Sequence, residues 1–265
     1  MKNRITSLLL AIALSASLIL PVHGAEEIPT AEATLDGESM DVEAFLYDGV
    51  SYFPLEETLK LLCPDTEVLC EAGVYTAKGE SFTMTVEKGK TYLEINGRYL
   101  YVPGGFKVRE EDGMIMVPAR ILGQAMGLQV DWKKKVVIFT TVGGPLQEAD
   151  KPYSDDDLDL IARVITHESG NQPLEGKMAV GNVIVNRVNS SSFPNTISEV
   201  IFQKNQFPGA TNATPNVESV IAAKLILEGA NVVPGAYFFN GVGKACWASR
   251  NKELLYTIGG HAFYG

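Results

Sequence analysis

The N-terminal half of the chain contains one pattern twice, and this repeat limits the folds that the half can adopt. The first copy, YDGVSYFPLEETLKLL, begins at Tyr47, and the second, EDGMIMVPARILGQAM, begins at Glu111. Equivalent positions lie 64 residues apart, namely Asp48-Gly49 with Asp112-Gly113 and Pro54 with Pro118. Each copy predicts an Asp-Gly turn, a short strand, and a helix with proline in its first turn. Segments between the copies alternate like strands, so the sequence predicts a small antiparallel sheet with two short helices.

This repeated pattern resembles the N-terminal domain of copper amine oxidases, a stalk domain often found in exported bacterial wall proteins. The resemblance covers about Ala33 to Val142 and implies a stalk domain over residues 25–142 that contacts the wall or another protein. It implies no copper, and the sequence of this half contains no histidine after residue 24. The polar segment GGPLQEADKPY, which carries glycine and proline, predicts a linker over residues 143–153.

Residues 1–24 have the pattern of a signal peptide. Lys2 and Arg4 precede an uncharged apolar run from Ile5 to Leu20, and cleavage is expected after Gly24 or Ala25. A run of about 16 apolar residues is shorter than the about 20 that span a membrane, although an uncleaved anchor is an alternative. The sequence therefore predicts a secreted protein that is extracellular or associated with the cell wall.

Three cysteines in an exported chain make a disulfide possible in principle. Cys63 and Cys70 are close enough in sequence to close a hairpin-like turn, which would leave Cys246 unpaired. A reduced pair is the alternative, and the spacing does not decide between them.

The acidic residues are concentrated in the N-terminal half. Residues 26–150 hold 11 Lys and Arg against 22 Asp and Glu, whereas residues 151–265 hold 9 against 10. No basic stripe is present in either half, which argues against nucleic acid as a partner. An acidic stalk also argues against electrostatic capture by phosphate-rich surfaces.

The C-terminal half begins with a helix that carries one acid on its apolar side. Ser154 is a good N-cap, and Asp155, Asp156 and Asp157 favour the positive end of a helix. Leu158, Ile161 and Ile165 then recur at helical spacing, and Glu168 is the next position of this stripe. Burial would raise the pKa of Glu168 towards the range that a general acid needs. The alternative is that the helix frays and leaves Glu168 in water.

Other catalytic patterns fit the sequence poorly. His167-Glu168 begins like a zinc-protease motif, but Asn171 stands where the second histidine would be. Ser169 lacks the paired glycines of a nucleophile elbow. Cys246 and His261 could form the thiol–imidazole pair of a cysteine peptidase, which stays an alternative. We expect no metal and no cofactor.

The segment ARVITHESGNQPLEGKMAVGNVIVNRVNSSSFPNTISEVIF resembles the spore cortex-lytic cell wall hydrolase family, as do QF, GAYFFN, the tryptophan Trp247 and IGGHAFYG after it. The resemblance covers Asp156 to Gly265 and implies a catalytic domain over residues 154–265 with a lysozyme-like, mainly helical α+β fold. It implies cleavage of peptidoglycan glycan strands, with Glu168 as the catalytic acid and an association with spores. The implied substrate-binding residues are Gln206, Phe207, Tyr237, Asn240, His261 and Tyr264. His167 and Ser169 depart from the small residues that usually flank the acid in this family.

A single acid fits one reaction best. Glu168 would protonate the glycosidic oxygen between N-acetylmuramic acid and N-acetylglucosamine, and then assist attack by the muramyl 6-hydroxyl, as in a lytic transglycosylase. A simple muramidase would need a second carboxylate about 5–10 Å away, and Glu175 is the nearest one in sequence. A wall-binding protein with an inactive hydrolase domain is the remaining alternative.

Overall fold

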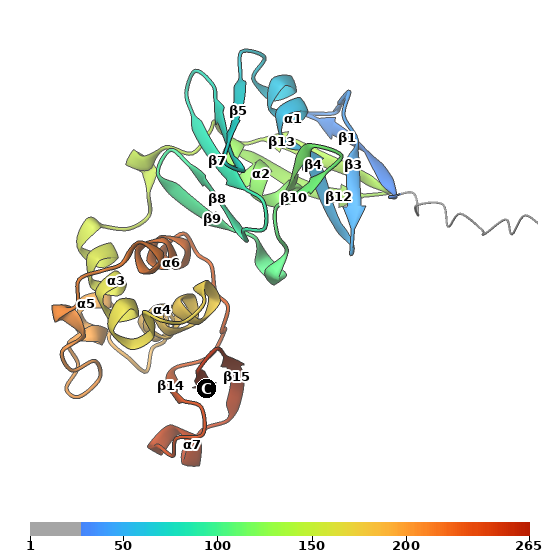
Figure 1. Ribbon diagram of the computed structural model, residues 1–265. Helices are drawn as coiled ribbons and strands as arrows, with labels where there is room; N and C mark the ends of the chain where they lie inside the picture. The colour runs from blue at the N-terminus through green and yellow to red at the C-terminus, as the bar shows by residue number, and fades with distance from the viewer. Residues whose placement is uncertain (1–27) are drawn as a thin grey trace, which may run out of the picture.

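The computed structural model describes residues 28–265, and the expected signal peptide lies outside them. This region consists of a sheet-rich N-terminal part, which we call the stalk, and a mainly helical C-terminal part (Figure 1). No helix within residues 28–265 is both long and apolar enough to cross a membrane.

The stalk contains two sheets and two short helices. The larger sheet has eight strands in the order β10-β11-β4-β3-β1-β13-β12, with β2 paired to β1. Its strands are β1 (Thr30–Leu35), β2 (Glu38–Ser39), β3 (Ala44–Tyr47), β4 (Val50–Pro54), β10 (Arg109–Glu111), β11 (Met114–Pro118), β12 (Leu128–Lys133) and β13 (Val136–Thr141). The smaller sheet is a meander of β5 (Glu67–Glu71), β6 (Val74–Lys78), β7 (Thr83–Glu87), β8 (Tyr92–Ile95) and β9 (Arg98–Tyr101). The helices are α1 (Leu55–Leu62) and α2 (Ala119–Met126).

The two copies of the repeat lie side by side in the larger sheet. β4 and β11 pair antiparallel, with Phe53 opposite Val117, and each strand leads directly into its helix. Pro54 and Pro118 occupy the N-cap positions, so each helix begins one residue later than the sequence suggests. Both residues of each Asp-Gly turn have positive φ, as a tight hairpin turn requires.

The sheets of the stalk differ from the single antiparallel sheet that the sequence predicts. The strands form two sheets instead of one. In the larger sheet the first and last strands of the stalk, β1 and β13, run in the same direction and pair in parallel. Cys63, Cys70 and Cys246 are all free thiols, so the structure contains no bond between Cys63 and Cys70.

The C-terminal part is built around one buried helix, α4 (Leu174–Val188), which packs against α3 (Asp155–Ser169) and α6 (Val217–Leu227). Gly181 of α4 permits this packing, since an added Cβ would lie 2.3 Å from Ile226 and 2.9 Å from Ile165. A three-stranded sheet in the order β14-β16-β15 completes this part. The remaining elements are α5 (Ile197–Ile201), β14 (Phe238–Gly241), α7 (Trp247–Asn251), β15 (Leu254–Ile258) and β16 (His261–Tyr264).

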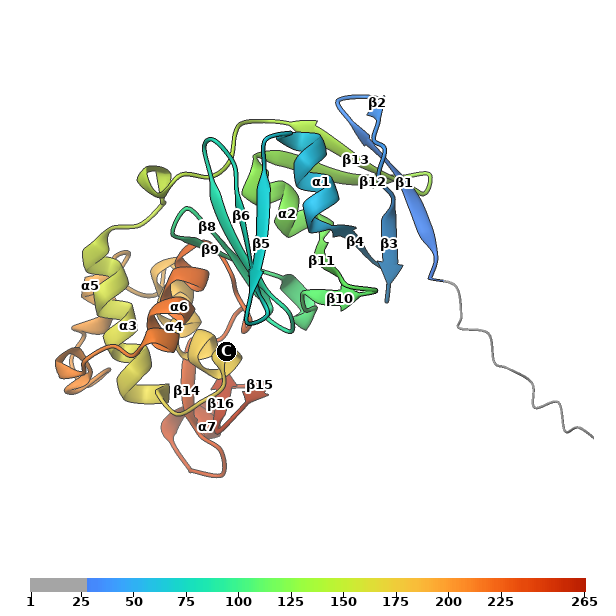
Figure 2. The same ribbon diagram turned by 45° about the horizontal axis from the view of Figure 1, so that its top comes forward.

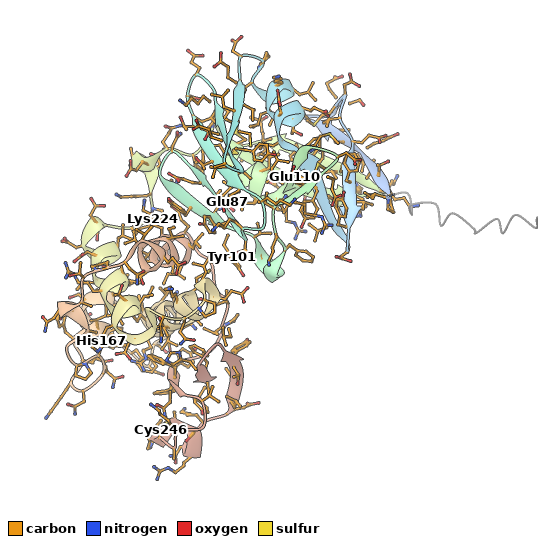
Figure 3. All side chains as sticks on the ribbon, in the orientation of Figure 1. Glu87, Tyr101, Glu110, His167, Lys224 and Cys246 are labelled. Carbon is orange, nitrogen blue, oxygen red and sulfur yellow. The ribbon has the colours of Figure 1, made fainter. Side chains whose placement is uncertain are left out.

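The two parts are in direct contact along β9 and α6 (Figures 1 and 2). The Arg98 guanidinium of β9 donates to both carboxylate oxygens of Glu228, with Nε 2.8 Å from Oε1. The Lys224 ammonium donates to the Gly97 carbonyl at 3.0 Å. Lys224 and Tyr101 both lie at this junction (Figure 3). The partly buried aromatic rings that pack here are Tyr92, Tyr99 and Tyr101.

Candidate active site

Glu168 lies in the last turn of α3, a helix that the sequence specifies at both ends. The Ser154 side chain accepts the Asp157 amide at 3.1 Å and caps the start of the helix. Ile161 and Ile165 are fully buried, and the Ser169 hydroxyl donates to the Ile165 carbonyl at 2.9 Å. The stripe therefore continues to the helix end, and the helix does not fray before Glu168.

The Glu168 carboxyl is half-buried, and its neighbours determine its protonation. Burial raises the pKa of Glu168 above its ordinary value, and the adjacent His167 partly opposes this rise. His167 itself is exposed. A half-buried carboxyl with a raised pKa can hold its proton closer to neutral pH, which is the property of a general acid.

The loop that follows Glu168 is fastened to the β15–β16 turn. The Gln172 amide donates to the Ser169 carbonyl at 2.9 Å, and the Gln172 side-chain oxygen accepts the Gly260 amide at 2.7 Å. The buried Lys177 ammonium donates to the Gln172 carbonyl and to Glu218, both at 2.6 Å. The hydrogen bond between Gln172 and Gly260 holds the end of α3 beside β16, the strand that carries His261.

His261 lies at this end of the small sheet, on the face that packs against α4. Its ring meets Phe239 edge-on, with centroids 5.5 Å apart. The His261 Nδ1 atom is buried and has no hydrogen-bond partner within residues 28–265. Burial, and to a lesser extent Lys244, lowers the pKa of His261, so the ring is neutral at neutral pH.

The opposite end of the small sheet is organised by Arg187, a residue that the sequence did not single out. Its buried guanidinium donates to the Tyr237 carbonyl at 2.8 Å and to the Gln206 side-chain oxygen at 2.7 Å. Burial lowers the pKa of Arg187 to about 10. The signal in the sequence was a charge at an inward position of the mostly apolar segment GKMAVGNVIVNRV, whose other polar residues are Lys177, Asn182 and Asn186. The rings around the guanidinium are Phe193, Phe207 and Phe238.

The six residues expected to bind substrate do not form one cluster. Gln206, Phe207 and Tyr237 surround Arg187, whereas His261 lies at the far end of the sheet, near Gln172. The Asn240 amide donates to the Lys244 carbonyl at 3.0 Å and holds the turn after β14. Phe207 and Tyr264 are only 7% and 8% exposed, so their rings pack inside the domain.

Glu175, the nearest second carboxylate in sequence, is directed towards the stalk. Its carboxylate accepts the Tyr101 hydroxyl at 3.2 Å, and burial together with this carboxylate raises the pKa of Tyr101 to about 12. Glu175 and Tyr101 line a cavity of about 680 Å³ between the two parts, and Glu168 is not among the lining residues. Across residues 28–265, no group of three or more His, Cys, Asp or Glu side chains is placed to hold a metal ion.

Replacing Arg187 by lysine tests whether the guanidinium organises this end of the domain. Lysine keeps the charge but cannot make the fork of hydrogen bonds to Tyr237 and Gln206. We expect a loss of about 1–3 kcal/mol in the free energy of unfolding, because buried acceptors lose their donors. Urea unfolding checks this value. Arg250→Lys, at an exposed site of α7, is the control, and equal stability of the two variants would contradict the assignment.

Comparison with known protein families finds one match in each half of the chain. Residues 171–264 match the Cell Wall Hydrolase family, and residues 34–139 match the Copper amine oxidase N-terminal domain. The first match begins three residues after Glu168. The resemblance expected from the sequence is confirmed for both halves of the chain.

Individual relatives resemble the C-terminal half. A spore cortex-lytic enzyme of Bacillus cereus is 34% identical over 139 residues, covering 46% of this chain and 52% of the relative. One from Oceanobacillus iheyensis is 34% identical over 129 residues, covering 46% of each protein. The chain thus spans about half the length of these curated relatives.

Two solved structures are also similar. The catalytic domain of the germination-specific lytic transglycosylase SleB from Bacillus anthracis is 30% identical, with 43% of this chain and 98% of that chain covered and a TM-score of 0.40. The catalytic domain of the Bacillus cereus SleB protein is 31% identical, with 46% of this chain and 100% of that chain covered and a TM-score of 0.41.

Proposed function

We propose that this chain, whose C-terminal part is of the cell wall hydrolase type, degrades peptidoglycan as a lytic transglycosylase. The bond cleaved is the one between N-acetylmuramic acid and N-acetylglucosamine, and Glu168 is the catalytic residue. The observation that carries the proposal is the half-buried Glu168 carboxyl with a raised pKa, at a helix end fixed to the small sheet. Its substrate is the glycan strand, and its place of action is outside the membrane, at the cell wall or the spore cortex.

In this reaction the Glu168 carboxyl gives up one proton and later takes one back. The protonated Glu168 carboxyl donates its proton to the glycosidic oxygen while the bond from that oxygen to C1 of the muramyl residue breaks. The resulting carboxylate then removes the proton from the 6-hydroxyl of the same residue while O6 bonds to C1. Glu168 ends protonated, no water is consumed, and the products are a 1,6-anhydromuramyl end and a free 4-hydroxyl.

A hydrolysis with two carboxylates is less well supported by the geometry. Inverting and retaining glycosidases place a second carboxylate across the bond from the acid. Glu175 accepts a hydrogen bond from Tyr101 of the stalk and lines the cavity between the two parts. Since its contacts are with the stalk, a reaction with a single acid is favoured.

The products of digestion distinguish the two reactions. Purified sacculi incubated with the protein should lose turbidity, and mass spectrometry of the soluble products should find 1,6-anhydromuramyl ends. Products heavier by one water, with reducing ends, would contradict transglycosylation and indicate a muramidase. Sedimentation of the protein with sacculi, without any loss of turbidity, would contradict the enzymatic proposal as a whole.

A further inference from the structure

Four aromatic rings form a continuous row beside β14 and the start of α7. They are Phe193, Tyr237, Phe238 and Trp247, and we call them the aromatic row. Phe193 stacks on Tyr237 with centroids 5.7 Å apart and lies 6.2 Å from Phe238. Phe238 meets Trp247 edge-on at 5.5 Å. Trp247 is 59% exposed and the other three are half-buried, so the row presents aromatic surface to solvent.

The row is held in place by the backbone beneath it. The Tyr237 amide donates to the Tyr264 carbonyl at 2.8 Å, and the Tyr237 carbonyl accepts Arg187. Trp247 begins α7, where Cys246 and Ser249 cap one another, with the Cys246 amide 2.9 Å from the Ser249 hydroxyl oxygen. Rings fixed in this way lose little conformational entropy when they bind a ligand.

The segment that contributes Trp247 to the row carries more positive than negative charge, in a chain whose net charge is −10. Residues 240–253 contain three cations, Lys244, Arg250 and Lys252, and a single acid, Glu253. None of the three cations forms an ion pair within residues 28–265. The Lys252 ammonium lies 5.5 Å from the Phe238 ring centroid. An aromatic surface with free cations at its border suits a ligand that has both apolar faces and carboxylates.

We propose that the aromatic row is a glycan-binding subsite separate from Glu168. A sugar ring stacks its C–H face on Trp247, and carboxylates on the muramyl residue or its stem peptide pair with Lys252 and the neighbouring cations. This identification of the ligand rests on the proposed function, since it takes the peptidoglycan strand as the substrate. The subsite holds the strand at a distance from the bond that is cleaved.

The position of the row fits an extended ligand. Gln172 and Arg187 mark the two ends of α4, which are about 20 Å apart at 1.5 Å per residue. The end at Gln172 adjoins the Glu168 loop, and the end at Arg187 carries Tyr237 and Phe193. Cys246, the residue before Trp247, lies at the end of the molecule away from the stalk, so the stalk does not cover this surface (Figure 3). One strand can therefore contact both places only if it spans several sugars.

The test measures binding separately from cleavage. All variants are made in the full chain with Glu168→Gln, and their binding to purified sacculi is measured by sedimentation. Trp247→Ala should weaken binding by about tenfold, as truncation of a central aromatic anchor does. Trp247→Phe should restore part of the loss. Phe202→Ala, which removes a 63% exposed ring of the C-terminal part outside the aromatic row, should leave binding unchanged.

The role of Lys252 is tested by the salt dependence of binding, and the identity of the ligand is tested with a second preparation of sacculi. Lys252→Gln should weaken binding at low salt and flatten its dependence on salt, because one ion pair is lost, whereas the exposed control Lys204→Gln should do neither. Sacculi stripped of anionic wall polymers should bind as well as untreated ones. Loss of binding on stripping would overturn the assignment of the glycan strand as the ligand.

The result that overturns the subsite is a Trp247→Ala variant that is folded by circular dichroism and binds sacculi as tightly as its parent. Failure of the proposed function has a different signature: the unmodified protein would release no muropeptides, while binding would still depend on Trp247. The two proposals can thus fail independently.

Discussion

Replacing Glu168 by glutamine is expected to lower the rate of sacculus lysis by about 10²–10⁴-fold, the contribution of a positioned general acid and base. Glutamine has nearly the same shape but cannot donate or accept the proton that the reaction moves twice. Within residues 28–265 only burial and His167 act on the Glu168 carboxyl, with no hydrogen bond that holds the fold, so the variant should fold normally. A turbidity assay on purified sacculi measures the rate, and circular dichroism checks the fold.

Glu175→Gln is the matched control, because it makes the same substitution seven residues away. Glu175 is exposed and contacts the stalk, so its variant should lyse sacculi at a rate close to that of the parent protein. Substantial activity of Glu168→Gln would reject Glu168 as the catalytic residue. An equal loss in both variants would favour a mechanism with two carboxylates.

The raised pKa of Glu168 also predicts a pH dependence. The acid must be protonated at the start of the reaction, so kcat/KM should fall as the pH rises through the pKa of Glu168. A carboxyl whose pKa is higher in the folded state than in the unfolded state opposes folding once it ionises. The Glu168→Gln variant should therefore gain stability over the parent above that pKa, and gain none below the unfolded pKa. Thermal melts across the pH range check this difference.

The sequence was sufficient for features that depend on residues close together in the chain. Ser154 begins α3 and the apolar stripe continues through Ile161 and Ile165, so helical geometry alone placed Glu168 on the inward side. The repeated Asp-Gly turns and prolines likewise located β4 with α1 and β11 with α2. In each case the residues that form the pattern are close together in the chain and determine the local structure directly.

Contacts between distant residues could not be predicted in this way. Arg187 is hydrogen-bonded to Tyr237, which lies 50 residues away in sequence, and Gln172 is hydrogen-bonded to Gly260, which lies 88 residues away. No local periodicity encodes either contact, because each depends on how the small sheet lies along α4. The parallel pairing of β1 with β13 depends in the same way on the path of the whole stalk.

Exposure was the least predictable property of the aromatic residues. The QF and HAFY motifs drew attention to Phe207 and Tyr264, whose rings are buried. Trp247, which belongs to the same set of motifs, is mostly exposed. A motif identifies residue types, whereas the packing of α7 and the small sheet decides which rings face solvent.

Breaking the ion pair between Arg98 and Glu228 is expected to cost about 3–5 kcal/mol of stability, because it leaves a buried charge without its partner. The two side chains are only 9% and 3% exposed, and they join β9 of the stalk to the end of α6. The hydrogen bond to Glu228 raises the pKa of Arg98. Glu228→Gln removes this favourable interaction, yet the guanidinium stays charged, because arginine does not lose its proton in proteins. Glu228→Gln should therefore lower the midpoint of urea unfolding strongly. It should also separate the unfolding of the stalk from that of the C-terminal part.

Two further variants decide whether this loss comes from the buried charge. Glu56→Gln removes an exposed ion pair with Lys60 on α1, whose side chains are 52% and 51% exposed, and should change stability by less than about 0.5 kcal/mol. The double variant Arg98→Met with Glu228→Leu replaces both charges by apolar groups and should recover most of the stability, since neither charge then remains buried. A Glu228→Gln variant that unfolds at the same urea concentration as the parent would contradict this account. In that case the aromatic packing of Tyr92 and Tyr99 would hold the two parts together without the ion pair.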